Sequence, residues 1–336
     1  MNYPEKLKIG DTIGICAPSD GISEPKKIEK LETAIRNLKQ MGYKVIETES
    51  VRKSERGRST SSKKRVEELM ELWKNDEVKL ILYAGGGDFL MEMLDELDFE
   101  EIKKYPPKWT QGFSDITTIS FLLNTICDIP SMYCESVKDY AMKPLYKNLE
   151  DSFKIISGEN IIQNSFEKYA AEKEDNEDYT YNLTKETKWN NLKAEEEIII
   201  KGRALGGCLD CIDTIIGTKF DVVKDYIEKY KNDGILWFLE CYEMSTPQFQ
   251  RILWKMKNAG YFKNCSGIIF GRPFIMREDY GITANEAILD VIGDLDIHII
   301  TEADIGHIPP QLAMVNGAML KITSKAGKGI VETYLK

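Results

Sequence analysis

Short apolar runs alternate with amphipathic segments in the first half of the chain. Residues 8–17, 78–83 and 108–113 are apolar runs of strand length. Residues 28–38 and 64–73 carry apolar side chains at helical spacing. Strands that alternate with helices are typical of a parallel sheet covered by helices on both faces. We therefore expect an α/β fold with a parallel sheet in this half.

The second half carries a further set of apolar runs. Strands are predicted at residues 198–201, 235–239 and 267–270. A turn is predicted at Gly206 and Gly207, because neighbouring glycines often mark a reversal of the chain. Three more short strands are predicted toward the end of the chain, at 297–301, 319–323 and 330–334.

Capping signals predict where two helices of the second half begin. Thr246 and Pro247 have the residue types of an N-cap and a first turn. Thr283 and Glu286 have the spacing of a capping box, in which each side chain accepts a hydrogen bond from the other residue's backbone N–H. We therefore expect helices to begin at these two places.

The segment 167–197 differs from both halves, because it is dense in charged residues and poor in aliphatic ones. This composition is typical of a linker or of a surface excursion. A chain of 336 residues is long enough for two domains, each with its own core. The predicted domains are 1–166 and 198–336, with the charged segment between them.

The composition narrows the class of protein. With 42% hydrophobic and 30% charged residues the chain is globular. Its net charge of −10 argues against nucleic acid or a membrane surface as partner, since phosphate binding requires clustered Lys and Arg. The first residues lack the apolar run of a signal peptide, and no run reaches the roughly 20 residues that span a bilayer. The seven cysteines are an odd number in a chain that needs no disulfides, so we expect reduced thiols and a cytoplasmic protein.

Only two histidines could act as a base at neutral pH. His298 lies in an apolar run and is expected to be a strand residue. His307 follows Gly306 and precedes Pro309 and Pro310, which indicates a loop after a strand. Loops at strand ends are where open α/β folds hold their sites. A purely structural histidine is the alternative at both positions.

Ser114 lies between a predicted strand and a predicted helix, and Asp115 follows it. A serine at such a turn exposes its hydroxyl, and the N-terminus of the next helix offers backbone N–H groups to an anion. This favours a nucleophile. An ordinary N-cap serine is the alternative, because the hydrolase elbow G-x-S-x-G is not matched.

Two further features follow predicted strands. Glu240 ends the strand at 235–239, where a carboxylate is costly unless it is paired or orients an imidazole. A salt bridge or a solvated strand end is the alternative. The run Gly85-Gly86-Gly87 allows close backbone approach, as an oxyanion-hole donor, a phosphate cradle or a turn. Nucleotide binding is poorly supported, because the Walker lysine and G-x-G-x-x-G are both missing.

The pair Cys208 and Cys211 has the C-x-x-C spacing of redox and zinc sites. A structural zinc site needs four ligands, and neither a second cysteine pair nor a histidine lies at suitable spacing. We therefore expect no metal.

Taken together, these segments resemble the LD-carboxypeptidase and microcin C immunity family of serine peptidases. The matching segments occur in the family's order and extend over nearly the whole chain: 8–19, Gly85-Gly86, 112–117 (GFSDIT), 202–209 (GRALGGCL), 238–240, 267–271 (GIIFG), 304–307 (DIGH) and 313–321.

The resemblance implies a catalytic triad of Ser114, Glu240 and His307, with an oxyanion hole from the backbone N–H groups of Gly86 and Asp115. It implies a Rossmann-like N-terminal domain with a parallel sheet and a swivelled, β-rich C-terminal α/β domain. It also implies a cytoplasmic homodimer that uses no metal and no cofactor.

Three departures from the family's pattern concern the expected substrate face. Cys208 replaces the usual asparagine, Gly87-Asp88 replaces Gly-Tyr, and residues 132–135 replace a Gly-Pro pattern. Gly85 and Cys208 are therefore candidate substrate-binding residues. The substrate is either murein tetrapeptide, which would lose its terminal D-alanine, or an amide of a peptidyl or aminoacyl nucleotide. The chain's length and the segment around Trp189 resemble the second branch.

A carboxypeptidase also needs a group that binds the free carboxylate of its substrate. Arg203 and Arg272 are the candidates, because both follow a glycine near predicted strand ends. Solvated surface charges are the alternative for both. A nucleotide-dependent ligase or synthetase, and a non-catalytic binding protein on the same fold, are the alternative functions.

Overall fold

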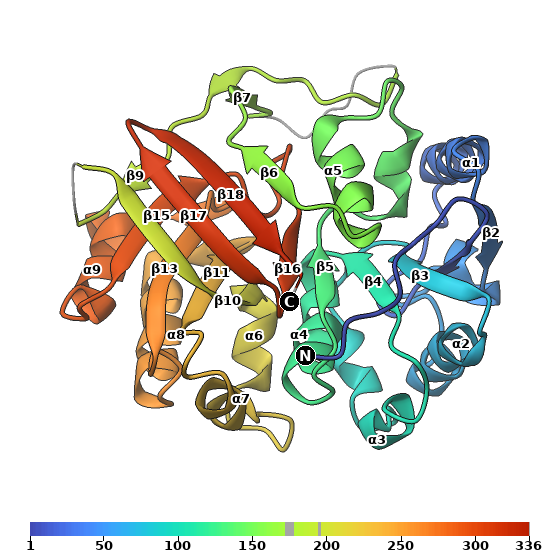
Figure 1. The fold of residues 1–336 in the computed structure, drawn as a ribbon, viewed down its shortest axis with the longest axis horizontal. Helices are drawn as coiled ribbons and strands as arrows, with labels where there is room; N and C mark the ends of the chain where they lie inside the picture. The colour runs from blue at the N-terminus through green and yellow to red at the C-terminus, as the bar shows by residue number, and fades with distance from the viewer. Residues whose placement is uncertain (172–177, 194–195, 336) are drawn as a thin grey trace. The chain divides into compact units, whose positions relative to one another are not determined.

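The protein forms two compact units in the computed structural model, which describes residues 1–171, 178–193 and 196–335 (Figure 1). Each unit has its own sheet, so the predicted α/β class is confirmed. Each also takes its residues from separate stretches of chain. Unit 1 consists of Met1–Asn160, Glu174–Tyr181 and Ala313–Asn316, and unit 2 of Ile161–Lys173, Asn182–Leu312 and Gly317–Lys336.

Unit 1 is built on a six-stranded sheet in the order β16-β5-β4-β3-β1-β2. Its strands pair in parallel except for β16, which is antiparallel to β5. The carboxyl ends of the parallel strands therefore meet at one edge of the sheet. The strands are β1 (Thr12–Cys16), β2 (Lys44–Glu47), β3 (Val78–Tyr83), β4 (Trp109–Gly112), β5 (Ser131–Tyr133) and β16 (Met314–Asn316).

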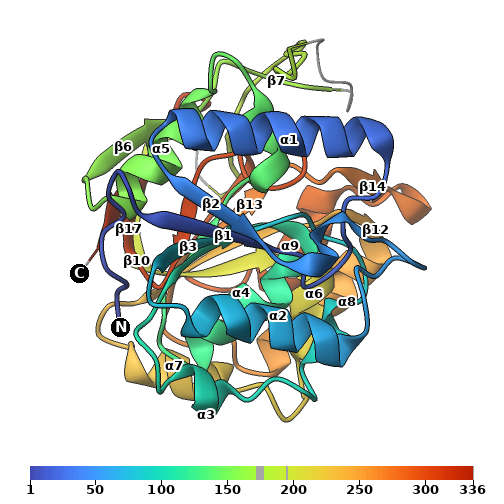
Figure 2. The same cartoon turned by 90° about the vertical axis from the view of Figure 1, so that its right-hand side faces the viewer.

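Helices cover both faces of this sheet, with α1 and α2 on opposite sides of β1 and β2 (Figure 2). The apolar face predicted at 28–38 is buried in α1, and every residue of β1 is buried, as expected for a strand covered on both sides. The helices are α1 (Pro25–Gln40), α2 (Ser62–Lys74), α3 (Phe99–Ile102), α4 (Thr117–Thr125) and α5 (Lys147–Ile156).

Unit 2 contains an eight-stranded mixed sheet in the order β6-β18-β17-β10-β11-β13-β15-β9. The four strands from β10 to β15 are parallel, and antiparallel strands extend both sides. This confirms a β-rich α/β unit. Its strands are β6 (Ile161–Asn164), β9 (Asn190–Asn191), β10 (Ile198–Cys208), β11 (Ile235–Glu240), β13 (Cys265–Gly271), β15 (His298–Ala303), β17 (Met319–Lys325) and β18 (Lys328–Tyr334).

The remaining elements of unit 2 are helices and short strand pairs. The capping box of Thr283 and Glu286 is confirmed at the start of α9. The other predicted helix begins one residue earlier than expected, because Ser245 is its N-cap and forms a capping box with Gln248. The elements are α6 (Leu209–Ile215), α7 (Val223–Lys229), α8 (Thr246–Asn258), α9 (Ala284–Ile292), β7 (Lys168–Tyr169), β8 (Lys185–Glu186), β12 (Glu243–Ser245) and β14 (Ile275–Arg277).

The predicted turn at Gly206 and Gly207 is wrong, since β10 continues through both glycines to Cys208. The two residues pair with Phe238 and Leu239 of β11. A Cβ on Gly206 would lie 1.7 Å from the carbonyl oxygen of Phe238. These glycines therefore serve a close approach of two strands rather than a reversal.

The described part of the charged segment 167–197 contributes to both units, with residues 178–181 in unit 1 and the others in unit 2. Its strand β9 pairs with β15, and Trp189 is buried. No helix among the described residues has the length and apolar character needed to cross a bilayer.

Candidate active site

Ser114 occupies a tight turn between β4 and α4. Its backbone has φ of +65°, in the left-handed region that non-glycine residues rarely adopt. Its N–H donates to the hydroxyl of Tyr133 over 3.4 Å, and a 3₁₀ turn, Ser114–Ile116, leads into the helix. Such backbone strain is characteristic of functional sites and of nucleophile elbows.

Gly86 lies directly against this turn. A Cβ built on Gly86 would be 2.8 Å from Cβ of Ser114, 2.9 Å from its Oγ and 3.3 Å from the backbone nitrogen of Asp115. No side chain fits there, so the loop after β3 brings its backbone up to the Ser114 hydroxyl. Unit 1 thus brings together Gly86, Ser114 and Asp115, three residues predicted to work as one group.

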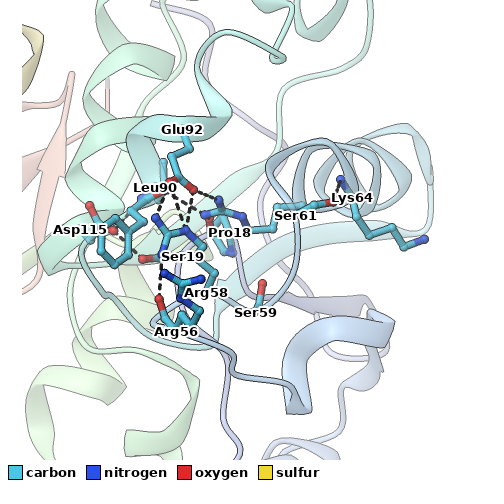
Figure 3. Close-up of polar contacts among 12 residues, drawn as sticks. Pro18, Ser19, Arg56, Arg58, Ser59, Ser61, Lys64, Leu90, Glu92 and Asp115 are labelled. Atoms are coloured by element: carbon cyan, nitrogen blue, oxygen red, sulfur yellow. Dashed lines mark hydrogen bonds and ion pairs between the residues drawn. The ribbon is translucent and has the colours of Figure 1, made fainter.

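The side chain of Asp115 is buried and fixed by hydrogen bonds (Figure 3). Its Oδ2 accepts from Oγ of Ser19 at 2.5 Å and from the N–H of Leu90 at 3.0 Å. Gly87 is close as well, since a Cβ there would lie 2.4 Å from the Ser19 hydroxyl. Asp115 therefore ties the nucleophile turn to the ends of β1 and β3.

A buried arginine of α2, Arg65, supports the same region. Arg65 donates to the carbonyl oxygens of Pro18 and Phe89 at 2.9 and 3.0 Å, and to Glu92 at 2.8 Å. Burial lowers the pKa of Arg65, and the Glu92 carboxylate opposes that change. Neither Arg65 nor Ser19 could be predicted as a supporting residue, because nothing in their local sequence marks them.

Glu240 and His307 form a buried pair in unit 2. Glu240 ends β11 and is 1% exposed, and His307 is 8% exposed on the loop after β15. Nδ1 of His307 lies 2.8 Å from Oε2 of Glu240. A carboxylate at this distance stabilises the tautomer that carries its proton on Nδ1 and leaves Nε2 as the acceptor. His298, by contrast, is exposed at the first position of β15.

Glycine is required immediately before the histidine. Gly306 has φ of +101°, and a Cβ there would lie 2.4 Å from Oε2 of Glu240. Tyr242 and Phe274 flank the imidazole, with ring centroids 4.8 and 6.5 Å from that of His307. These aromatic rings restrict the imidazole's orientation and shield part of it from water.

Asp304 anchors the loop that carries His307. Its carboxylate is fully buried, and accepts from Nε1 of Trp189 at 2.9 Å and from the backbone N–H of Phe166 at 3.2 Å. Arg272 is 3% exposed, donates to Asp304 at 2.5 Å and to the carbonyl oxygen of Glu302 at 2.8 Å. These contacts explain why Trp189 is buried, and they favour a structural role for Arg272.

Arg203 is also engaged with the protein. Its guanidinium donates to Asp233 at 2.6 and 2.8 Å and to the carbonyl oxygen of Gly317 at 2.5 Å, and it lies over the ring of Tyr230. Substrate binding by Arg203 or Arg272 stays a prediction that these contacts do not favour.

The cysteine thiols near Glu240 have raised pKa values. A hydrogen bond with Cys211, burial and the charge of Glu240 raise the pKa of Cys208 well above its usual range. Burial raises the pKa of Cys241 in the same way. None of the seven cysteines forms a disulfide. Within the described residues, no group of three or more His, Cys, Asp or Glu side chains could hold a metal ion.

Two known domain families match the chain. Residues 13–134 match the LD-carboxypeptidase N-terminal domain, and residues 201–322 match the LD-carboxypeptidase C-terminal domain. The two matches contain the candidate residues of unit 1 and those of unit 2, respectively.

Curated relatives and solved structures agree with this assignment. The chain is 24% identical over 337 residues to a probable murein peptide carboxypeptidase of Bacillus subtilis, covering 99% of this chain and 95% of that protein. It is 24% identical over 345 residues to the microcin C7 self-immunity protein MccF of Escherichia coli, covering 98% and 95%. The structure of MccF in complex with glutamyl sulfamoyl guanosine has a TM-score of 0.81 at 22% identity, covering 100% of this chain and 99% of that one. The chain therefore belongs to the LD-carboxypeptidase family of serine peptidases.

Proposed function

We propose that the protein hydrolyses an amide bond with Ser114 as nucleophile, His307 as general base and Glu240 as the group that orients the imidazole. The observation that carries the proposal is the buried contact of 2.8 Å between Nδ1 of His307 and the Glu240 carboxylate. A histidine held in this way is prepared to accept a proton at Nε2. The strained turn at Ser114 supports the choice of nucleophile.

The reaction proceeds through an acyl-enzyme. Oγ of Ser114 attacks the amide carbonyl carbon while Nε2 of His307 takes the hydroxyl proton. Glu240 stabilises the imidazolium that forms, and the imidazolium then gives its proton to the leaving amine. A water molecule, activated by the same imidazole, attacks the ester and releases the acid.

The backbone N–H groups of Gly86 and Asp115 stabilise the oxyanion of the tetrahedral intermediate in this proposal. Support comes from the positions of both residues against Ser114. Donors fixed in advance stabilise developing charge without reorganising during the reaction.

The substrate is proposed to be a peptide with a free carboxylate, such as murein tetrapeptide, from which terminal D-alanine would be released. The relative from Bacillus subtilis is named as a probable murein peptide carboxypeptidase. An amide between an amino acid and a nucleotide-like group is the second candidate, because MccF has been solved with glutamyl sulfamoyl guanosine.

Mass spectrometry of reaction products separates these substrates. The purified enzyme is incubated with murein tetrapeptide and, separately, with an aminoacyl-sulfamoyl adenylate. Loss of one alanine residue from the tetrapeptide is expected. Hydrolysis of the sulfamoyl compound alone would favour the second candidate, and cleavage of neither would contradict the proposal.

We also propose that the enzyme is a cytoplasmic homodimer. Its seven free cysteines fit a reducing compartment. Light scattering coupled to size-exclusion chromatography should give twice the chain mass of 38.5 kDa. A mass of one chain at micromolar concentration would contradict the dimer.

Replacement of Gly86 with alanine should lower kcat by roughly 10² to 10³, the usual effect of losing one oxyanion donor. The added Cβ would lie 2.8 Å from Cβ of Ser114, so the loop must move away from the hydroxyl. Steady-state kinetics measure the loss. Gly10→Ala is the control, because no atom lies within 4 Å of its added Cβ, so the effect of this substitution is limited to the backbone strain of its φ of +95°. An unchanged kcat in Gly86→Ala would remove this loop from the oxyanion hole.

Chelation should leave the activity intact. The proposed chemistry uses only side chains and backbone N–H groups, so dialysis against EDTA is expected to change kcat by less than about twofold. Loss of activity that added zinc restores would show a metal-dependent step.

A further inference from the structure

Lys138 lies beside the loop Gly85-Gly86-Gly87, at the edge of the unit 1 sheet where Ser114 is also found. After β5 the chain forms a 3₁₀ turn, Val137–Ala141, which packs against α1. Nζ of Lys138 lies 3.6 Å from the position of a Cβ on Gly85, and its Cε lies 4.0 Å away. Among the described residues, no other heavy atom outside the adjoining residues comes within 4 Å of that position, so the Lys138 ammonium is the group nearest to this side of Gly85.

Lys138 belongs to a charged cluster with Glu24, Lys27, Lys30 and Asp139, and among the described residues it is the lysine of this cluster without an ion pair. Lys27 pairs with Glu24 at 2.6 Å, and Lys30 pairs with Asp139 at 3.5 Å. Lys138 makes no hydrogen bond or ion pair with any residue that the structure describes. Burial lowers the pKa of Lys138, with Lys27 and Lys30 adding to this effect and Asp139 and Glu24 opposing it. A half-buried ammonium in this position would be stabilised by an anion.

The place of Lys138 in the fold is that of a ligand-binding residue. Gly85 follows β3, Ser114 follows β4 and Lys138 follows β5, and these parallel strands have their carboxyl ends at one edge. Open α/β sheets bind ligands at this edge. Gly85 is the direct neighbour of Gly86, and consecutive Cα atoms are about 3.8 Å apart. Lys138 and Ser114 therefore approach two successive residues of the same loop.

The geometry points to Lys138 as the residue that binds the terminal carboxylate of the substrate, one residue beyond the scissile amide. The inference rests on the proposed function and gives its substrate a specific requirement, a free carboxylate on the leaving amino acid. Arg203 and Arg272 have their guanidinium groups on Asp233 and Asp304, whereas the Lys138 ammonium lies beside Gly85 without an ion pair to a described residue. A contact between an ammonium and a carboxylate discriminates strongly against a peptide whose C-terminus is an uncharged amide.

The test compares a tetrapeptide with a free C-terminus and the same peptide with an amidated C-terminus. In Lys138→Gln, kcat/KM for the free acid should fall about 10- to 100-fold, while kcat/KM for the amide stays within about twofold of the wild-type value. The preference for the acid should thus nearly disappear. Lys138→Arg should recover part of it, and Lys27→Gln is the control, because Lys27 belongs to the same cluster and already has Glu24 as a partner.

Two results would overturn the inference while leaving the proposed function in place. One is a wild-type enzyme that cleaves acid and amide equally fast through Ser114, and the other is a Lys138→Gln variant that keeps the wild-type preference. If Lys138→Gln lowered kcat/KM only for an aminoacyl-sulfamoyl adenylate, the peptide carboxylate would likewise be excluded as the group that Lys138 binds.

Equilibrium binding separates this inference from the catalytic proposal. In the Ser114→Ala background, calorimetry should show that Lys138→Gln weakens binding of the free-acid peptide about 10-fold or more and leaves binding of the amide unchanged. Equal binding of the acid with and without Lys138 would overturn the inference, even if the wild-type enzyme proved inactive on every peptide.

Discussion

The Ser114→Ala variant is expected to fold normally and to hydrolyse its substrate about 10⁴- to 10⁶-fold more slowly than the wild-type enzyme. The substitution removes one oxygen atom, and with it the atom that would form the acyl-enzyme. The side-chain contact of Asp115 with Ser19, which holds the turn, does not involve Ser114. Alanine also has a Cβ at the same position, so the packing against Gly86 is retained.

Single-turnover kinetics and circular dichroism together check this expectation. The matched control is Ser54→Ala, since Ser54 is an exposed serine of the same unit. Its kcat should equal that of the wild type. If Ser114→Ala turned over substrate at a rate within tenfold of the wild type, Ser114 would not be the nucleophile.

The second large effect is expected for Glu240→Gln, in which kcat should fall about 10⁴-fold. The glutamine amide is neutral and nearly equal in size, so the buried position at the end of β11 stays filled. It can donate to Nδ1 of His307 and thereby stabilise the tautomer that carries its proton on Nε2. That tautomer cannot accept the serine proton, and the imidazolium loses its counter-ion.

The control for this variant is Glu243→Gln, three residues further on in β12, where the carboxylate is exposed and faces Arg277 at 3.4 Å. Its kcat should be unchanged. Full activity of a correctly folded Glu240→Gln would assign the contact with His307 a structural role and would require another group to orient the base.

Sequence patterns predicted elements well where hydrophobic periodicity is strong and local. The strand at 78–83 is β3 without adjustment, and the capping box at Thr283 is present as predicted. The glycine pair in β10 was misassigned for a physical reason. Glycine permits both a reversal and a close strand approach, and only the carbonyl oxygen of Phe238, 32 residues later, shows which applies.

The site could be predicted only in part for a related reason. Glu240 stands out in the sequence as a carboxylate that ends a buried strand, and His307 as one of two histidines, on a loop after a strand. The residues that hold them in place left no local signal. Asp304 accepts a hydrogen bond from Trp189, which belongs to the segment predicted to be a charged linker. Nothing in the sequence distinguishes Lys138 from the other lysines, and only the fold places it beside Gly85.

The unit 1 sheet is complete only after its edge strand β16 has been synthesised. Every other strand of the unit 1 sheet is translated before residue 134, whereas β16 comes from residues 314–316. While the chain emerges from the ribosome, the outer side of β5 has no neighbour in its own sheet, and an unpaired strand edge can recruit other chains. Chaperone protection of the nascent chain would be most valuable in that interval. A gene cut at residue 166 would encode a fragment that keeps this edge open permanently, so inclusion bodies are its expected fate in an expression host.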